Sequence, residues 1–109
     1  MQITAQEIKS SAVRLSVQIG EQEIARAFLY LIKNDLHHKP YGLLEDVFVQ
    51  EQHRSQGYGQ KIVQAVIAEA KKRGCYKLIG TSRYEREKVH QFYQELGFND
   101  YGKEFRIDL

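Results

Sequence analysis

The amino-acid sequence predicts an α/β sandwich of the α+β kind, in which two helices pack on a mixed sheet. Two observations support this fold class. In the first half of the chain, apolar residues alternate with polar ones or form short runs rich in β-formers. In the second half, two segments change to helical spacing and are separated by a short strand-like segment. Helices that alternate with strands in this way must cover a common sheet.

Three strands are expected in the first half. Residues 12–19 alternate apolar with polar side chains and end at Gly20 and Glu21, which predicts a strand and a tight turn. Residues 24–32 are apolar on both faces, as in a covered strand, and should form a hairpin with 12–19. A loop with the one proline, Pro40, leads into the third strand, 43–49. Residues 3–8 predict a weaker edge strand.

The second half predicts helix, strand, helix and strand. Apolar residues from Ile62 to Ala70 recur at helical spacing, and Gly74 follows Lys71-Lys72-Arg73 as a helix stop. Residues 76–81 form a short apolar segment that predicts a strand. Apolar spacing from Val89 to Leu96 predicts a second helix that Gly97 ends, and the alternation at 105–109 predicts a last strand.

The composition limits the classes of function that the chain can have. With 109 residues, 42% of them hydrophobic, the chain can build one modest core, so a single domain over 1–109 is expected. A net charge of +2 with acids and bases mixed argues against nucleic-acid binding. No apolar run or leader suggests a membrane or secretion, which favours the cytoplasm. Cys75 is the only cysteine and is expected to be a small buried residue.

The turn Arg54-Ser55-Gln56-Gly57-Tyr58-Gly59 joins the third strand to the first helix. Glycines there let the backbone approach a ligand, and the free N–H groups of a helix start attract anions. Arg54 and Lys61 add positive charge. The spacing is neither that of a P-loop nor that of a dinucleotide fingerprint, and the alternative is a simple turn before a helix.

Three blocks in order resemble the GCN5-related N-acetyltransferase (GNAT) family: Leu44 to Val49, the R-x-x-G-x-G turn at 54–59, and Phe92 to Phe98. They cover about residues 43–98. Within the family, Glu45-Asp46-Val47 and Gly74-Cys75-Tyr76-Lys77 are similar to glucosamine-6-phosphate N-acetyltransferases, and they also occur in many bacterial members of unassigned substrate.

The resemblance implies a largely antiparallel sheet whose strands 43–49 and 76–81 splay apart, with acetyl-CoA as co-substrate in the opening. Pantetheine would bond to the backbone of the third strand, and the pyrophosphate would reach the amides of 55–60. The cofactor-binding residues implied are Val47, Phe48, Val49, Arg54, Ser55, Gln56, Gly57, Tyr58, Gly59, Gln60 and Arg86.

Acetyl transfer to an amine needs a base, a donor to the carbonyl oxygen and an acid for the thiolate. The resemblance implies Glu45 as the base, on the same strand face as Val47, whose N–H would polarise the acetyl carbonyl. The alternative for Glu45 is a solvated or salt-bridged carboxylate. Asp46 is expected to point to the opposite face and to serve structure.

Tyr93 matches the family's tyrosine near the CoA sulfur and would protonate the thiolate, the alternative being a core aromatic. Arg86 stands where many members have an asparagine that contacts the cofactor, and it could instead meet a phosphate. His90 is an alternative base or a partly exposed helix residue. No metal site is expected, because His37, His38 and His53 lack ligand spacing.

The N-terminus departs from the family pattern. Members normally have two helices that cover the acceptor pocket, and the few residues between Ile8 and Val13 are too short to form them. The acceptor site would then be open or completed by a second subunit, so a homodimer is one hypothesis. A small-molecule or a protein amine would suit an open site. The competing function is a catalytically silent acetyl-CoA-binding sensor or partner module.

Overall fold

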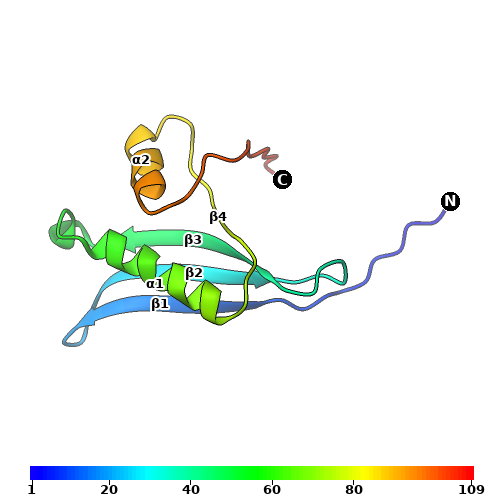
Figure 1. The fold of residues 1–109 in the computed structure, drawn as a ribbon, viewed down its shortest axis with the longest axis horizontal. Coiled ribbons are helices and arrows are strands. Elements are labelled where there is room, and N and C mark those ends of the chain that lie inside the picture. Colours follow the sequence, from blue (N-terminus) through cyan, green and yellow to red (C-terminus); the bar gives the residue numbers. More distant parts are fainter. The chain divides into compact units, whose positions relative to one another are not determined.

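The computed structural model describes residues 1–109 as two compact units, Met1–Ile79 and Gly80–Leu109. In the first unit, helix α1 lies along one face of a sheet (Figure 1). The elements are β1 (Ser11–Ile19), β2 (Gln22–Ile32), β3 (Tyr41–Val49), the 3₁₀ turn η1 (Glu51–His53), α1 (Tyr58–Lys72), β4 (Leu78–Gly80) and α2 (Glu87–Glu95).

The sheet follows the order of the chain, β1-β2-β3-β4. β1 and β2 form the expected antiparallel hairpin, with Leu15 opposite Ala27, and Gly20 turns the chain at a φ of 62° that favours glycine. β2 and β3 are also antiparallel. The segment before β4 joins β3 through two bonds, Gly42 N–H to Lys77 O and Tyr76 N–H to Pro40 O. These bonds advance in the same direction along both segments, as parallel neighbours do, so the predicted mixed sheet is confirmed.

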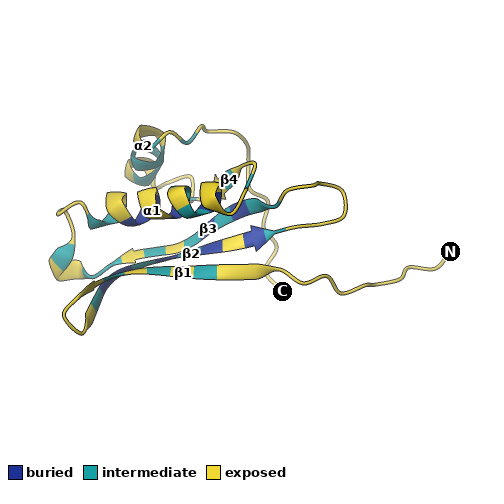
Figure 2. Cartoon of the chain, turned by 60° about the horizontal axis from the view of Figure 1, so that its bottom comes forward, coloured by how far each residue is buried: buried dark blue, intermediate teal, exposed yellow.

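The core lies between α1 and the sheet. Ile62, Val63 and Val66 on α1 are buried, and so are Ala25, Ala27 and Leu29 on β2 (Figure 2). Leu29 and Val63 have no exposed surface, and burying one such side chain stabilises the fold by about 1.5–3 kcal/mol. The helical spacing that predicted α1 therefore marks the face that the sheet covers.

Gly42 marks a place where β3, the core and β4 come very close. A Cβ at this position would lie 2.8 Å from Leu29 Cδ1 and 2.9 Å from Leu78 Cδ1, and 3.7 Å from Cys75 Sγ. Real Cβ atoms do not approach other atoms so closely. A larger residue here would therefore force the ends of the Leu29 and Leu78 side chains to move.

Both helices end where the sequence predicted, just before Gly74 and Gly97. At the end of α1, Gly74 has a φ of 78° and the N–H groups of Gly74 and Cys75 bond to the carbonyls of Lys71 and Ala70. At the end of α2, Gly97 has a φ of 103°, and Gly97 and Phe98 repeat the pattern onto Gln94 and Tyr93. These paired bonds are Schellman motifs, in which a left-handed glycine closes the helix.

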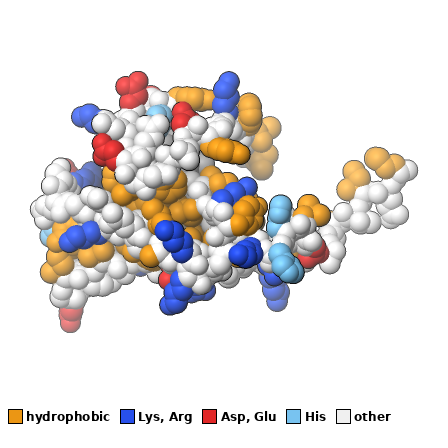
Figure 3. Space-filling view, in the orientation of Figure 1, with side chains coloured by type: hydrophobic (Ala, Val, Ile, Leu, Met, Phe, Trp, Pro, Cys, Tyr) orange, Lys and Arg blue, Asp and Glu red, His pale blue; other side chains and the backbone are white.

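Two expected strands are absent. Residues 1–10 and 98–109 form no strand, so the predictions of an edge strand at 3–8 and a last strand at 105–109 are wrong. Ile3, Phe105 and Ile107 are exposed, and Figure 3 shows apolar side chains standing free at the N-terminal end. A strand needs a neighbour to accept its hydrogen bonds, and neither segment has one. β4 is also shorter than the predicted 76–81.

Candidate active site

A bulge in β3 creates the irregular backbone of the site. Phe28 lies opposite Glu45 and Arg26 lies opposite Phe48, so Ala27 alone faces the two residues Asp46 and Val47. Asp46 takes a φ of 51°, a left-handed conformation that non-glycine residues seldom adopt. The extra residue interrupts the ladder and bends the strand, so main-chain polar groups at Asp46–Val47 lose their regular partners.

The bulge also changes which face each side chain occupies. Glu45 shares a face with Phe28, whereas Val49, opposite the buried Ala25, faces α1. Val47 alternates with Val49, so the expectation that Glu45 and Val47 share a face is wrong. Glu45 is half-buried on the face that α1 leaves uncovered, and its carboxylate makes no hydrogen bond or ion pair within the chain. A carboxylate in this position is open to a ligand on that face.

The turn after β3 shows the geometry of an anion site. Ser55 and Gly57 take φ values of 64° and 87°, and Gly57 caps α1 without any side-chain hydrogen bond. The first helical bond runs from Lys61 N–H to Gly57 O at 3.1 Å. The amides of residues 58–60 therefore have no partner in the chain, and the first turn of α1 holds no acidic residue. Free amides and the helix dipole together favour a phosphate group here.

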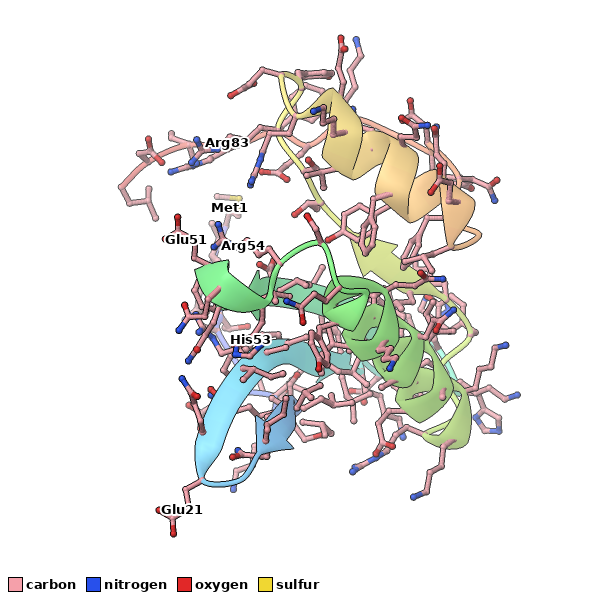
Figure 4. All side chains as sticks on the ribbon, turned by 90° about the vertical axis from the view of Figure 1, so that its left-hand side faces the viewer. Met1, Glu21, Glu51, His53, Arg54 and Arg83 are labelled. Carbon is pink, nitrogen blue, oxygen red and sulfur yellow. The ribbon has the colours of Figure 1, made fainter.

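Arg54 is positioned by the strand that it follows. Its Nε donates to Val49 O at 2.9 Å, and its guanidinium carbon lies 5.5 Å from the centre of the Phe48 ring. Figure 4 shows Glu51 and His53 on η1 and Arg54 directly after it, on the way to α1. Beyond the turn, Lys61 Nζ lies 5.8 Å from the Tyr58 ring. Positive charge thus stands on both sides of the free amides.

The second unit holds the remaining predicted residues on or beside α2. The Tyr93 ring lies 5.6 Å from the Phe92 ring and 5.3 Å from the Phe98 ring, and it is half-buried. Arg86 is the N-cap of α2 and is exposed. His90 Nε2 lies 2.7 Å from Arg83 O, so this nitrogen donates its proton to the carbonyl.

The structure thus brings the β3 and turn residues together in the first unit, while Arg86, His90 and Tyr93 belong to the second. The sequence analysis missed Arg26, which comes from β2 and places its guanidinium carbon 4.7 Å from the Phe48 ring centre. The sequence does single out this residue, because Arg26 is a lone charge between the apolar residues Ala25 and Ala27.

Two further features concern the histidines and the helices. His37 and His38 are exposed in the loop before β3, and the His37 ring lies 5.3 Å from the Tyr76 ring. No group of three or more histidine, cysteine, aspartate or glutamate side chains is arranged to hold a metal ion.

Neither helix has the length and apolar character needed to cross a membrane.

Comparisons with known proteins show the family to which the chain belongs. Residues 7–98 match the model of the acetyltransferase (GNAT) family. This chain therefore belongs to the GNAT family, and the resemblance seen in the sequence is confirmed. Over 68 residues it is 35% identical to a glucosamine 6-phosphate N-acetyltransferase of Trypanosoma brucei brucei, a match that covers 62% of this chain and 44% of that protein.

Two other relatives extend the comparison. The chain is 33% identical over 67 residues to an aminoglycoside N(6')-acetyltransferase type 1 of Stenotrophomonas maltophilia, covering 62% of this chain and 44% of the relative. The structure of a putative acetyltransferase from Agrobacterium tumefaciens superposes with a TM-score of 0.83 at 27% identity, over 90% of this chain and 69% of that one. The chain thus spans less than half the length of the curated relatives it matches.

Proposed function

We propose that this chain is an acetyl-CoA-dependent N-acetyltransferase that moves an acetyl group to a primary amine by direct attack in a ternary complex. The observation that carries the proposal is the pairing of two features on one strand. β3 holds Glu45 beside the Asp46–Val47 bulge, and its far end leads into the turn whose amides at 58–60 are free. A base in the middle of a strand and an anion site beyond the end of that strand suit a long phosphorylated co-substrate.

The residues fit such a co-substrate. The amides of residues 58–60 would hold the pyrophosphate, with Arg54 as a nearby positive charge. The backbone of Val47 and Val49 would bond to the pantetheine, and Arg86 would meet a phosphate. Bound acetyl-CoA supplies the activated acetyl thioester, and no metal is needed for this chemistry.

Each catalytic role follows from the chemistry of the group that performs it. Glu45 accepts a proton from the acceptor ammonium, directly or through water, because only the neutral amine is nucleophilic. The N–H of Val47 at the bulge donates to the acetyl oxygen and stabilises the charge that develops there. Tyr93 gives its hydroxyl proton to the departing sulfur. The nitrogen loses two protons between ammonium and amide: the first goes to Glu45 and from there to solvent, and the second, lost after the attack, replaces the proton that Tyr93 gave to the sulfur, so one proton is released overall.

A second candidate function is an acetyl-CoA-binding module without turnover, acting as a sensor or as a partner of another protein. The observation that favours it is that residues 1–10 form no helix and are exposed. A second copy of the chain could complete an acceptor pocket on the uncovered sheet face. We include a homodimer in the proposal for this reason, with light scattering as its check.

The test is calorimetric titration with acetyl-CoA, followed by a thiol-release assay of the same sample against amines, aminosugars and peptides. Binding with thiol release supports the enzyme. Binding without release for every acceptor supports the silent module. If acetyl-CoA does not bind, both functions are wrong.

A further inference from the structure

The sheet face that α1 leaves uncovered carries an apolar surface directly beside Glu45. Two neighbouring pairs of the β2–β3 ladder form this region, Phe28 opposite Glu45 and Tyr30 opposite Leu43. The residues between these pairs are buried leucines on both strands, and they face the core. Because side chains alternate along a strand, all four residues of the two pairs share the other face. Phe28, Tyr30 and Leu43 together form the apolar surface.

The two rings of the apolar surface are arranged side by side. The Phe28 and Tyr30 rings are nearly parallel, with 17° between their planes and 6.2 Å between their centres. Tyr30 is 38% exposed, and its hydroxyl makes no hydrogen bond within the chain. Exposed apolar side chains that lie together mark a binding surface more often than single ones do. A flat apolar molecule therefore finds a ring to pack on next to the carboxylate.

The basic groups of this face lie on the opposite side of Glu45. Arg26 is opposite Phe48, and the guanidinium carbons of Arg26 and Arg54 lie 4.7 Å and 5.5 Å from the Phe48 ring centre. Arg54 belongs to the end of the face where the pyrophosphate of the co-substrate is proposed to bind. The acetyl group would then reach Glu45 from the basic side, which leaves the apolar surface to the acceptor.

The apolar surface contains no acidic side chain, and its neighbours are cations. Arg14 lies with its guanidinium carbon 5.7 Å from the Phe28 ring centre, and both of its Nη atoms donate to Glu23. Further along β3, Tyr41 follows on the same face, and Lys77 Nζ lies 4.8 Å from its ring centre. An acceptor with a second ammonium would meet these cations and no free carboxylate. A single amine on an uncharged body suits the surface.

We propose that the acceptor is a primary amine with one positive charge and an aromatic ring, its nitrogen at Glu45 and its ring on Phe28 and Tyr30. This inference rests on the proposed function and names its substrate class. Residues two apart on a strand are separated by about 7 Å, so a chain of about three carbons reaches from the carboxylate to the Tyr30 ring. The new N–C bond replaces the C–S bond of the thioester, coenzyme A leaves as the thiol, and one proton is released.

The experiment compares three amines with the same carbon chain: 3-phenylpropylamine, 3-cyclohexylpropylamine and propylamine. Their nitrogens have nearly equal basicity, because the chain separates each nitrogen from the ring. Thiol release at saturating acetyl-CoA gives kcat/KM for the full chain, for Tyr30→Ser, which removes the ring, and for Tyr30→Phe, which keeps it. Ile19→Ser is the matched control, because Ile19 is 50% exposed and lies at the other end of the hairpin. Thermal melting verifies that each variant is folded.

The expected kcat/KM is about ten- to a hundredfold higher for 3-phenylpropylamine than for propylamine. It should also exceed that of 3-cyclohexylpropylamine about twofold or more, although the saturated ring is the more hydrophobic, because only the flat ring stacks on an aromatic side chain. Tyr30→Ser should remove most of both preferences, whereas Tyr30→Phe and Ile19→Ser should keep them. Equal kcat/KM for the phenyl compound and propylamine, a preference for the cyclohexyl compound, or a full preference in Tyr30→Ser would overturn the inference and leave the proposed function standing.

Light scattering separates the other occupant of this face, a second copy of the chain. A dimer that Tyr30→Ser dissociates, together with no preference for the phenyl compound, assigns the apolar surface to the second copy and overturns the inference. If acetyl-CoA binds and no amine is acetylated, titration of the coenzyme A complex with 3-phenylpropylamine decides. Binding that Tyr30→Ser abolishes supports the site, and absence of binding rejects it. Absence of acetyl-CoA binding is a separate result, which overturns the proposed function and this inference with it.

Discussion

Glu45 lies directly opposite Phe28 across the β2–β3 ladder, one residue before the bulge that begins at Asp46. The carboxylate therefore stands on the uncovered face of the sheet, beside main-chain groups that the bulge has released. This arrangement supports the role proposed for Glu45 and gives the first prediction.

Glu45→Gln should lower kcat for acetyl transfer about 10²–10⁴-fold at neutral pH, because the amide cannot accept the ammonium proton. The affinity for acetyl-CoA should not change. Asp46→Asn is the matched control, since asparagine tolerates the left-handed backbone and Asp46 has no proposed chemical role. Thiol release at saturating acetyl-CoA measures the effect, and a full rate in Glu45→Gln would remove Glu45 from the mechanism.

Gly57→Ala should weaken acetyl-CoA binding and destabilise the fold by about 1 kcal/mol, because φ is 87° at the turn that presents the free amides. Gly74→Ala is the control at the other end of α1, with a φ of 78° and likewise no atom within 4 Å of the added Cβ. It should cost similar stability with no loss of affinity. Calorimetry and urea unfolding measure both quantities, and equal affinities in the two variants would contradict the anion site.

Gly42→Ala should destabilise the fold by about 1–3 kcal/mol, because the new methyl would press on the side chains of Leu29 and Leu78. Gly102→Ala is the control, since nothing lies within 4 Å of its Cβ position and its φ is not positive. Urea unfolding should show a lower midpoint for the first variant only. Equal midpoints would mean that the leucines rearrange freely.

The Cys75 thiol should react slowly with Ellman's reagent at pH 8. Burial raises the pKa of this thiol, so the reactive thiolate is scarcer in the folded protein than in the unfolded chain. The rate should rise when the same sample is unfolded in urea. A folded rate equal to the unfolded rate would show that Cys75 is more accessible than its environment indicates.

The ion pair between Arg14 and Glu23 should make stability depend on pH in the acid range. The hydrogen bonds from Arg14 lower the pKa of Glu23 below its ordinary value of 4.5. Stabilisation from a lowered carboxyl pKa is present above the unfolded pKa and is lost as pH falls through the folded value. Glu23→Gln should therefore unfold at lower urea than the parent at pH 7, and the difference should shrink below pH 4.5. A constant difference would exclude the pair as its cause.

The sequence predicted the β1–β2 hairpin and both helix ends because alternation and glycine positions act locally. It also predicted the turn at the start of α1, since Gly57 and Gly59 stand in the chain where that helix begins. Such features depend on a few neighbouring residues and on backbone preferences that do not require the rest of the fold.

What the sequence did not predict depends on long-range pairing. Asp46 is not glycine, so nothing in the local pattern announces a left-handed residue, and the shift in register moved Val47 to the other face. Residues 105–109 alternate like a strand, yet no neighbouring edge pairs with them in this chain. Arg26 and Arg54 are far apart in sequence and meet only because Phe48 is paired with β2.

The agreement between strand order and chain order has a consequence for synthesis on the ribosome. Each antiparallel pair joins consecutive segments, so β1, β2 and β3 can associate before residues beyond Val49 emerge. The apolar face of this nascent sheet stays exposed until α1 emerges, which follows within a few residues. This order of emergence shortens the time during which the uncovered apolar face could contact another nascent chain.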